Sequence, residues 1–106
     1  MISDTDIEKA VDWLRDSAPK IAKARAEMIY AEEYRKSLKA MLLREHIDES
    51  LGAQEREAYA DERYKKHIES YREAIEKYEL LRAQREAANV KIEAWRSMSA
   101  NQRVGP

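Results

Sequence analysis

Residues 64–95 read YKKHIESYREAIEKYELLRAQREAANVKIEAW, and this stretch decides the fold. It contains neither glycine nor proline, so nothing in it interrupts a helix. Apolar and aromatic side chains recur along it at a mean spacing of about 3.5 residues, which is the coiled-coil period. The spacing predicts a long helix with one narrow apolar seam, made of Tyr64, Ile68, Tyr71, Ile75, Tyr78, Leu81, Ala88, Ile92 and Trp95.

Arg85 is the residue that departs from this pattern, because its neighbours along the seam are apolar. One interpretation makes Arg85 a polar layer that fixes the register or the oligomeric state. The other makes it an outward-pointing side chain at a place where the seam drifts around the helix. The sequence leaves both interpretations open.

Helical periodicity also covers the amino-terminal half of the chain, where we expect a first arm over residues 5–47. Thr5 and Glu8 have the spacing of a capping box. Pro19 either begins a new helix or kinks a continuous one. Apolar residues recur at steps of three and four on both sides of that proline, with Trp13 at the edge of the seam: Ile7, Ala10, Val11, Leu14, Ile21, Ala24, Met28, Ala31, Tyr34, Leu38, Met41 and Leu42.

Between the two periodic segments we expect a loop over residues 48–52, since Gly52 and the possible caps Asp48 and Ser50 lie there. The second arm then covers residues 53–99, and the tail 100–106 should fray. Two arms of similar length around a short loop predict one all-α domain over residues 1–106, a long antiparallel helical hairpin of coiled-coil type whose first arm is broken or kinked near Pro19.

The register of this hairpin follows from the arm lengths. Met28 should lie opposite Tyr71 or Arg72, and Trp13 should meet the Ala87–Ala88 region, where small side chains leave room for an indole. In the competing layout residues 5–18 fold back to form a compact three-helix bundle.

Composition excludes several classes of protein. Two glycines, two prolines and no phenylalanine among 106 residues argue against a turn-rich β fold, and the absence of cysteine excludes a disulfide framework. The 20 basic and 21 acidic residues nearly balance, whereas disordered chains usually carry a large net charge. No apolar run approaches the ~18 residues of a membrane span, and the acidic amino terminus does not resemble a signal peptide. We therefore expect a cytoplasmic protein with no membrane partner.

The motifs that enzymes use are missing from the sequence. Leu43 and Tyr64, three residues before His46 and His67, stand where a di-iron bundle needs glutamates. Two glycines cannot build a phosphate-binding loop, and no serine has the context of a catalytic nucleophile. The sequence predicts no enzymatic activity, no metal and no cofactor.

Because the apolar seam is thin for a chain of this size, we expect a homodimer or higher oligomer in which hairpins pack as a helical bundle. A protein partner could dock at the carboxyl-terminal end through Ile92, Trp95, Arg96 and Met98, since Trp and Arg dominate interface hot spots. Alternatively, Trp95 closes the bundle over Ile7 and Val11.

A second hypothesis is an accessory factor that binds single-stranded nucleic acid. The basic residues available for it are Arg82, Arg85, Lys91, Arg96 and Arg103. Tyrosines could add base stacking. However, Tyr64, Tyr71 and Tyr78 are spaced by seven residues, and that spacing favours one position of a helix seam.

Three runs in the second half, residues 52–60, 78–88 and 92–103, resemble small phage and prophage proteins that lie among recombination and replication genes. The resemblance covers residues 50–103, and its most specific part is the ending Trp95-Arg96-Ser97. It implies a phage-encoded accessory protein in the cytoplasm of a bacterial host, and it transfers no catalytic residue.

Overall fold

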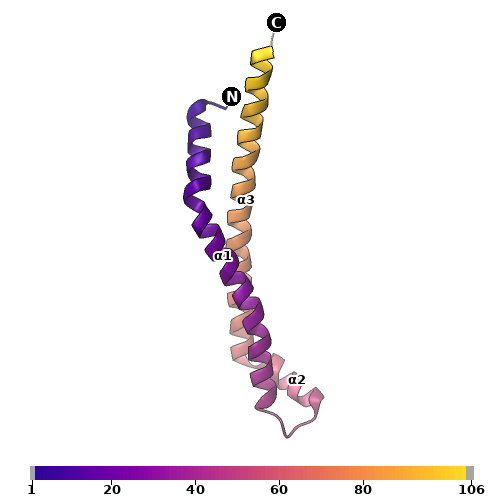
Figure 1. Cartoon of the computed structure of the whole chain (residues 1–106). Helices are drawn as coiled ribbons and strands as arrows, with labels where there is room; N and C mark the ends of the chain where they lie inside the picture. Colours follow the sequence, from indigo (N-terminus) through magenta and orange to yellow (C-terminus); the bar gives the residue numbers. More distant parts are fainter. Residues whose placement is uncertain (1, 105–106) are drawn as a thin grey trace. The chain divides into compact units, whose positions relative to one another are not determined.

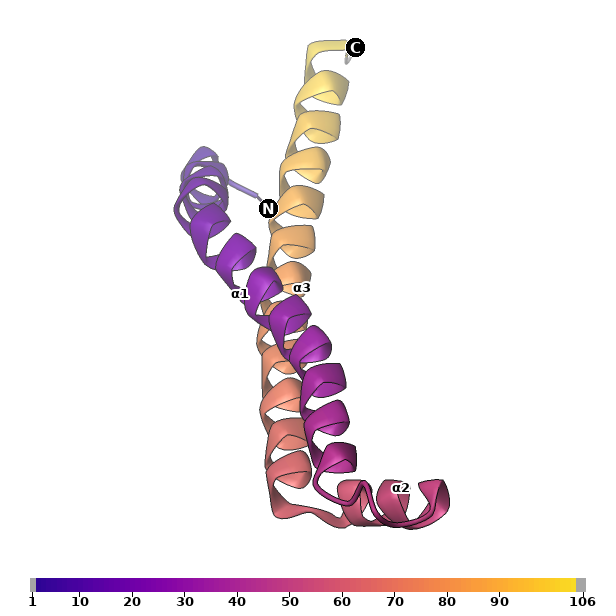
Figure 2. The same ribbon diagram turned by 60° about the horizontal axis from the view of Figure 1, so that its bottom comes forward.

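The computed structural model describes residues 2–104, with side chains up to residue 102, and this part of the chain forms three α-helices and no strand. They are α1 (Asp4–Arg44), α2 (Leu51–Ala60) and α3 (Glu62–Val104). The contacts divide the chain into two compact units. One joins the beginning of α1, up to Lys23, to the part of α3 from Glu79 on; the other is Ala24–Tyr78. In each unit α1 and α3 run antiparallel, side by side (Figure 1 and Figure 2), which confirms the predicted all-α hairpin.

Helix α1 begins at Asp4, one residue before the predicted arm, and its cap lies two residues before the predicted one. The capping box is formed by Ser3 and Asp6 and not by Thr5 and Glu8. The Asp6 backbone N–H donates to Ser3 Oγ at 3.1 Å, and the Ser3 N–H donates to Asp6 Oδ2 at 2.9 Å. These two hydrogen bonds satisfy backbone groups that the helix itself leaves unpaired.

Pro19 lies inside α1, which continues without a break to Arg44. Of the two alternatives at this proline, the structure therefore shows the continuous helix, and residues 5–18 do not fold back. The pattern of burial keeps its phase across Pro19, at alternating steps of three and four residues. The buried and half-buried seam residues of α1 are Ile7, Ala10, Leu14, Ser17, Ile21, Ala24, Met28, Ala31, Arg35, Leu38 and Leu42.

This strict alternation corrects part of the predicted first seam. Val11, Tyr34 and Met41 lie beside the seam and are 48 %, 39 % and 57 % exposed. Ser17 and Arg35 take seam positions that hydrophobicity alone did not suggest; Ser17 is 4 % exposed, and its Oγ donates to the Leu14 carbonyl at 3.4 Å. Helical phase thus decides which side chains are buried, even where the residue is polar.

The same correction applies to α3. Its half-buried residues also follow steps of three and four: Tyr64, His67, Tyr71, Ala74, Tyr78, Leu81, Arg85, Ala88, Ile92 and Trp95. Ile68 and Ile75, predicted for the seam, are 37 % and 36 % exposed and flank it. Arg85 is half-buried at a seam position, so the structure favours the polar layer over the outward-pointing alternative.

The second arm is not continuous. Ser50 caps α2 by accepting a hydrogen bond from the Ala53 N–H, as the sequence suggested, but α2 ends at Ala60. Asp61 then adopts an extended backbone, with φ −66° and ψ 135°, and α3 begins at Glu62. In Figure 2, α2 points away from the pair of long helices instead of extending α3. The connection between α1 and α2 covers residues 45–50 in place of the predicted 48–52.

The carboxyl-terminal end of α3 also differs from the prediction. The second arm was expected to end at residue 99, whereas the helix extends to Val104. Residues 100–104 contain no glycine or proline that would end a helix, and Gly105 and Pro106 lie outside the described residues.

Candidate interaction surface

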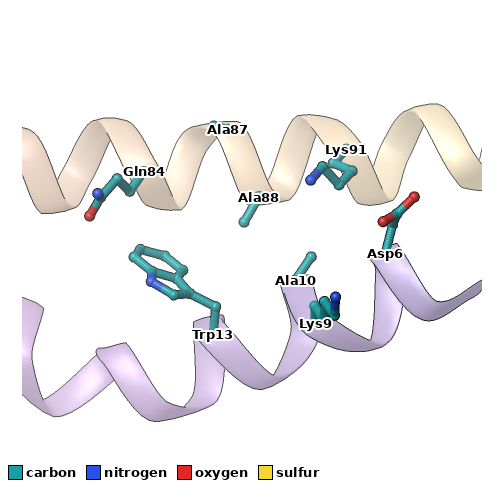
Figure 3. A pocket seen from close by; sticks show the side chains of 8 residues that line it. All are labelled: Asp6, Lys9, Ala10, Trp13, Gln84, Ala87, Ala88 and Lys91. Carbon is teal, nitrogen blue, oxygen red and sulfur yellow. The ribbon is translucent and has the colours of Figure 1, made fainter. Parts of the chain in front are cut away.

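The unit that contains both ends of the chain has a groove of about 320 Å³ between α1 and α3. Figure 3 shows the indole of Trp13 pointing from α1 toward α3, below Gln84 and Ala88. Trp13 is half-buried and shares the groove with Ala87 and Ala88, so the predicted neighbours are confirmed. The groove is lined by Asp6, Lys9, Ala10, Trp13, Gln84, Ala87, Ala88 and Lys91.

Charges of both signs lie at the end of this groove that is away from Trp13 (Figure 3). The hydrogen bonds from Ser3 hold the pKa of Asp6 below its usual value, and the nearby Lys91 and Lys9 ammonium groups act in the same direction. The groove therefore combines an aromatic wall, small apolar residues and compensated charges.

Farther along α3, the predicted docking residues Ile92, Trp95, Arg96 and Met98 come together. Trp95 belongs to the seam, and its Nε1–H donates to Asp4 Oδ1 at 3.2 Å. Ile92, Trp95 and Met98 are half-buried, whereas Arg96 is exposed and pairs with Glu93 at 3.0 Å.

Trp95 lines two shallow grooves, one toward the amino terminus and one along α3. The first, about 260 Å³, is lined by Ile2, Ser3, Asp4, Trp95, Met98, Ser99 and Gln102. The second, about 360 Å³, is lined by Glu93, Trp95, Arg96, Ser97, Ser99 and Ala100. Trp95 is thus anchored by a hydrogen bond within its own chain, and part of it remains accessible.

The basic residues of the nucleic-acid hypothesis do not share one face of α3. Arg82 pairs with Glu79 at 3.5 Å and with Glu86 at 3.4 Å. Arg85 lies in the seam and Lys91 lines the Trp13 groove. Arg96 is paired with Glu93, as described above, and the side chain of Arg103 lies outside the described residues.

The tyrosines spaced by seven, Tyr64, Tyr71 and Tyr78, are half-buried at seam positions in the unit Ala24–Tyr78. The Arg35 guanidinium lies 5.7 Å from the centre of the Tyr71 ring, and Tyr59 packs edge-on against Tyr64 at 5.4 Å. The rings of Tyr64 and Tyr71 are therefore in contact with side chains of the protein itself rather than arranged as a free platform.

Sequence reasoning missed the role of His67, which lies in the same unit. Its Nε2 is 2.6 Å from the Ala31 carbonyl oxygen, so Nε2 carries the proton that it donates, and the imidazole packs 5.1 Å from the Tyr34 ring. A strict count of heptads from Tyr71 would have placed His67 in the seam.

The corner between α2 and α3 is the strongest cluster of charges. Arg63 donates to Glu45 Oε2 at 2.6 Å and to Asp61 Oδ2 at 2.9 Å, and its backbone N–H donates to Asp61 Oδ1 at 2.8 Å. These hydrogen bonds lower the pKa of Asp61 to about 2 and lower the pKa of Glu45. The arrangement joins the chain just after the end of α1 to the start of α3.

Within the described residues, no group of three or more His, Asp or Glu side chains is placed to hold a metal ion. None of the described helical segments is long and apolar enough to cross a membrane. Comparisons with protein-family models, with curated proteins and with solved structures gave no match.

Proposed function

We propose that this protein is a non-enzymatic helical interaction module that oligomerises and docks a protein partner, with the carboxyl-terminal half of α3 as its main contact surface. The observation that carries the proposal is the burial of α3. None of its residues from 62 to 102 is fully buried, although α1 buries seven apolar side chains and one serine, Ser17.

The physical cause is the pairing of large side chains with small ones. Three of the seven buried apolar residues of α1 are alanines, namely Ala10, Ala24 and Ala31. A tyrosine or tryptophan of α3 cannot be fully enclosed by an alanine, so part of its surface stays in water. A further helix against α3 would remove that surface from water and stabilise the fold.

The total exposed area supports the same proposal. The chain exposes 8045 Å². A folded monomer of this mass exposes about 6,100 Å² on average, which leaves an excess of about 1,900 Å² per chain. Burial of that order by each partner is typical of the larger, stable subunit interfaces.

The phage-type resemblance of residues 50–103 supports an accessory role for such a module. Accessory proteins of this kind need a shape and a contact surface but no catalytic site. Accordingly, we propose a host-cell or phage protein as the partner of the Trp95 end.

The alternative, an accessory factor for single-stranded nucleic acid, has weaker support because Arg82 and Arg96 are neutralised by glutamates of their own helix. It predicts salt-dependent binding of an oligonucleotide. Absence of binding at low ionic strength would exclude it.

Sedimentation equilibrium tests the proposed function. We expect a mass of at least twice the 12.4 kDa of the chain at concentrations of about 10 µM and above. A monomer with full helix content at those concentrations would contradict the proposal, because α3 would then be stable without any cover.

A further inference from the structure

Helix α3 carries a second apolar stripe on the face opposite its seam. Leu80, Ala83, Ala87, Val90 and Ala94 follow one another at steps of three, four, three and four residues. Leu80 is 60 % exposed, Val90 is 67 % exposed, and the three alanines are exposed. The stripe touches the Trp13 groove through Ala87 and lies entirely in the unit with both chain ends. This spacing is the coiled-coil period, repeated on a surface that no part of the described chain covers.

Rows of opposite charge border the stripe. Leu80, Ala87 and Ala94 are seven residues apart and occupy the first position of successive heptads. The residue before each of them is a glutamate: Glu79, Glu86 and Glu93. On the other border the corresponding residues are Lys77, Gln84 and Lys91. A stripe with an acidic border and a partly basic border specifies how another helix can lie against it.

We propose that this stripe is the site at which a second copy of the chain docks, with the two α3 helices parallel and in register. The proposal rests on the proposed function, which requires an oligomer. It adds a contact face of α3 other than the half-buried seam, and it gives the direction of that contact. Small residues at Ala83, Ala87 and Ala94 let two helices approach at the short end of the range of about 8–10 Å.

The charges select the parallel direction. In a parallel pair of helices, the residue just before the first heptad position of one helix faces the residue five positions later in the partner helix. Glu86 of one copy therefore meets Lys91 of the other. An antiparallel pair would instead set glutamates against glutamates and lysines against lysines, which is unfavourable. In this register Glu79 faces Gln84 and Glu93 faces Met98, so Glu86 and Lys91 form the one ion pair, made twice in the symmetric dimer. This reciprocal pair is the charge complementarity that favours a second copy of the chain as the occupant.

The chain has no cysteine, so single cysteines report the contact directly. We expect V90C and, separately, L80C to form a covalent dimer rapidly on mild oxidation, since identical positions face each other in a parallel pair. V11C is the matched control, because Val11 is 48 % exposed but lies on another helix face. In a mixture of the L80C and A94C variants, an antiparallel pair would link L80C to A94C and would not link L80C to itself. That result would overturn the proposal.

Charge exchange tests the register in the cysteine-free protein. E86K should weaken the dimer by at least about tenfold, and the double variant E86K/K91E should restore it, because the ion pair is rebuilt with reversed signs. Circular dichroism of each variant controls for the loss of the intrachain pair between Glu86 and Arg82. Failure of the double variant to recover, with helix content intact, would overturn the parallel register.

A third variant separates this inference from the proposed function. L80E/V90E places charge in the stripe and should give a helical monomer at concentrations where the wild type is a dimer. If L80E/V90E remains a dimer, another face makes the oligomer and only the stripe proposal fails. If the wild type is itself a monomer, the proposed function fails as well.

Discussion

Asp61 ends one helix and begins the next. Its extended backbone stops α2, while its carboxylate accepts the N–H of Arg63 in the first turn of α3. The same carboxylate, together with Glu45, holds the Arg63 guanidinium. An aspartate in this role must be ionised, because the protonated acid is a far weaker acceptor for a cationic donor.

The corner therefore predicts a pH dependence. Asp61 has its pKa lowered from 3.8 to about 2, chiefly by the Arg63 side chain. Since the folded pKa is the lower one, the stabilisation is complete above 3.8 and is lost as the pH falls through about 2. NMR titration of the Asp61 carboxyl carbon measures this, and Arg63→Gln should move its midpoint up toward 3.8.

Arg72→Gln is the control for this titration, because Arg72 pairs with Glu69 within α3 and does not touch Asp61. It should leave the Asp61 midpoint unchanged. A wild-type midpoint at the ordinary value for aspartate would mean that the corner does not form in solution.

Trp95 offers a second test at the scale of a single residue. Trp95→Ala removes a half-buried ring and its hydrogen bond to Asp4, so the free energy of unfolding should fall by about 1–2 kcal/mol. Arg96→Ala, which alters an exposed neighbour, should change it by less than about 0.5 kcal/mol. Chemical denaturation followed by circular dichroism compares the two; equal stability of Trp95→Ala and the wild type would place the ring outside the seam.

At the scale of the helices, hydrophobic periodicity predicted the type and direction of both arms but not every member of the seams. It selected Ile68 and Ile75 because they are apolar, whereas strict alternation places the half-buried His67 and Ala74 in the seam. A search for recurring apolar residues does not select a polar residue, even when that residue occupies a seam position. The break at Asp61 was missed for a related reason: an isolated aspartate is a weak signal until its partner Arg63 is seen.

Pro19 gives a prediction about α1 as an element. The proline has no N–H to donate to the carbonyl of Arg15, and its ring crowds that carbonyl, yet α1 runs through it. Pro19→Ala should raise the free energy of unfolding by about 1–3 kcal/mol, because alanine restores the bond and the helix propensity. Thermal and chemical unfolding would both report the gain; a loss of stability would show that the packing of α1 requires the proline.

For the molecule as a whole, the sequence predicted the all-α hairpin and the candidate residues at its carboxyl-terminal end. The division of the contacts into two units was not predicted. The apolar repeat continues across the boundary between the units, so the sequence pattern does not change there. The Trp13 groove was foreseen only as a meeting of Trp13 with Ala87 and Ala88. Its charged lining depends on side chains from both helices.

The central claim is that α3 is completed by association with another chain. The most direct test is the midpoint of thermal unfolding as a function of protein concentration. If folding and association are coupled, the midpoint should rise by about 5 °C or more over a hundredfold increase in concentration. A midpoint independent of concentration, together with full helix content at the lowest concentration, would contradict the claim.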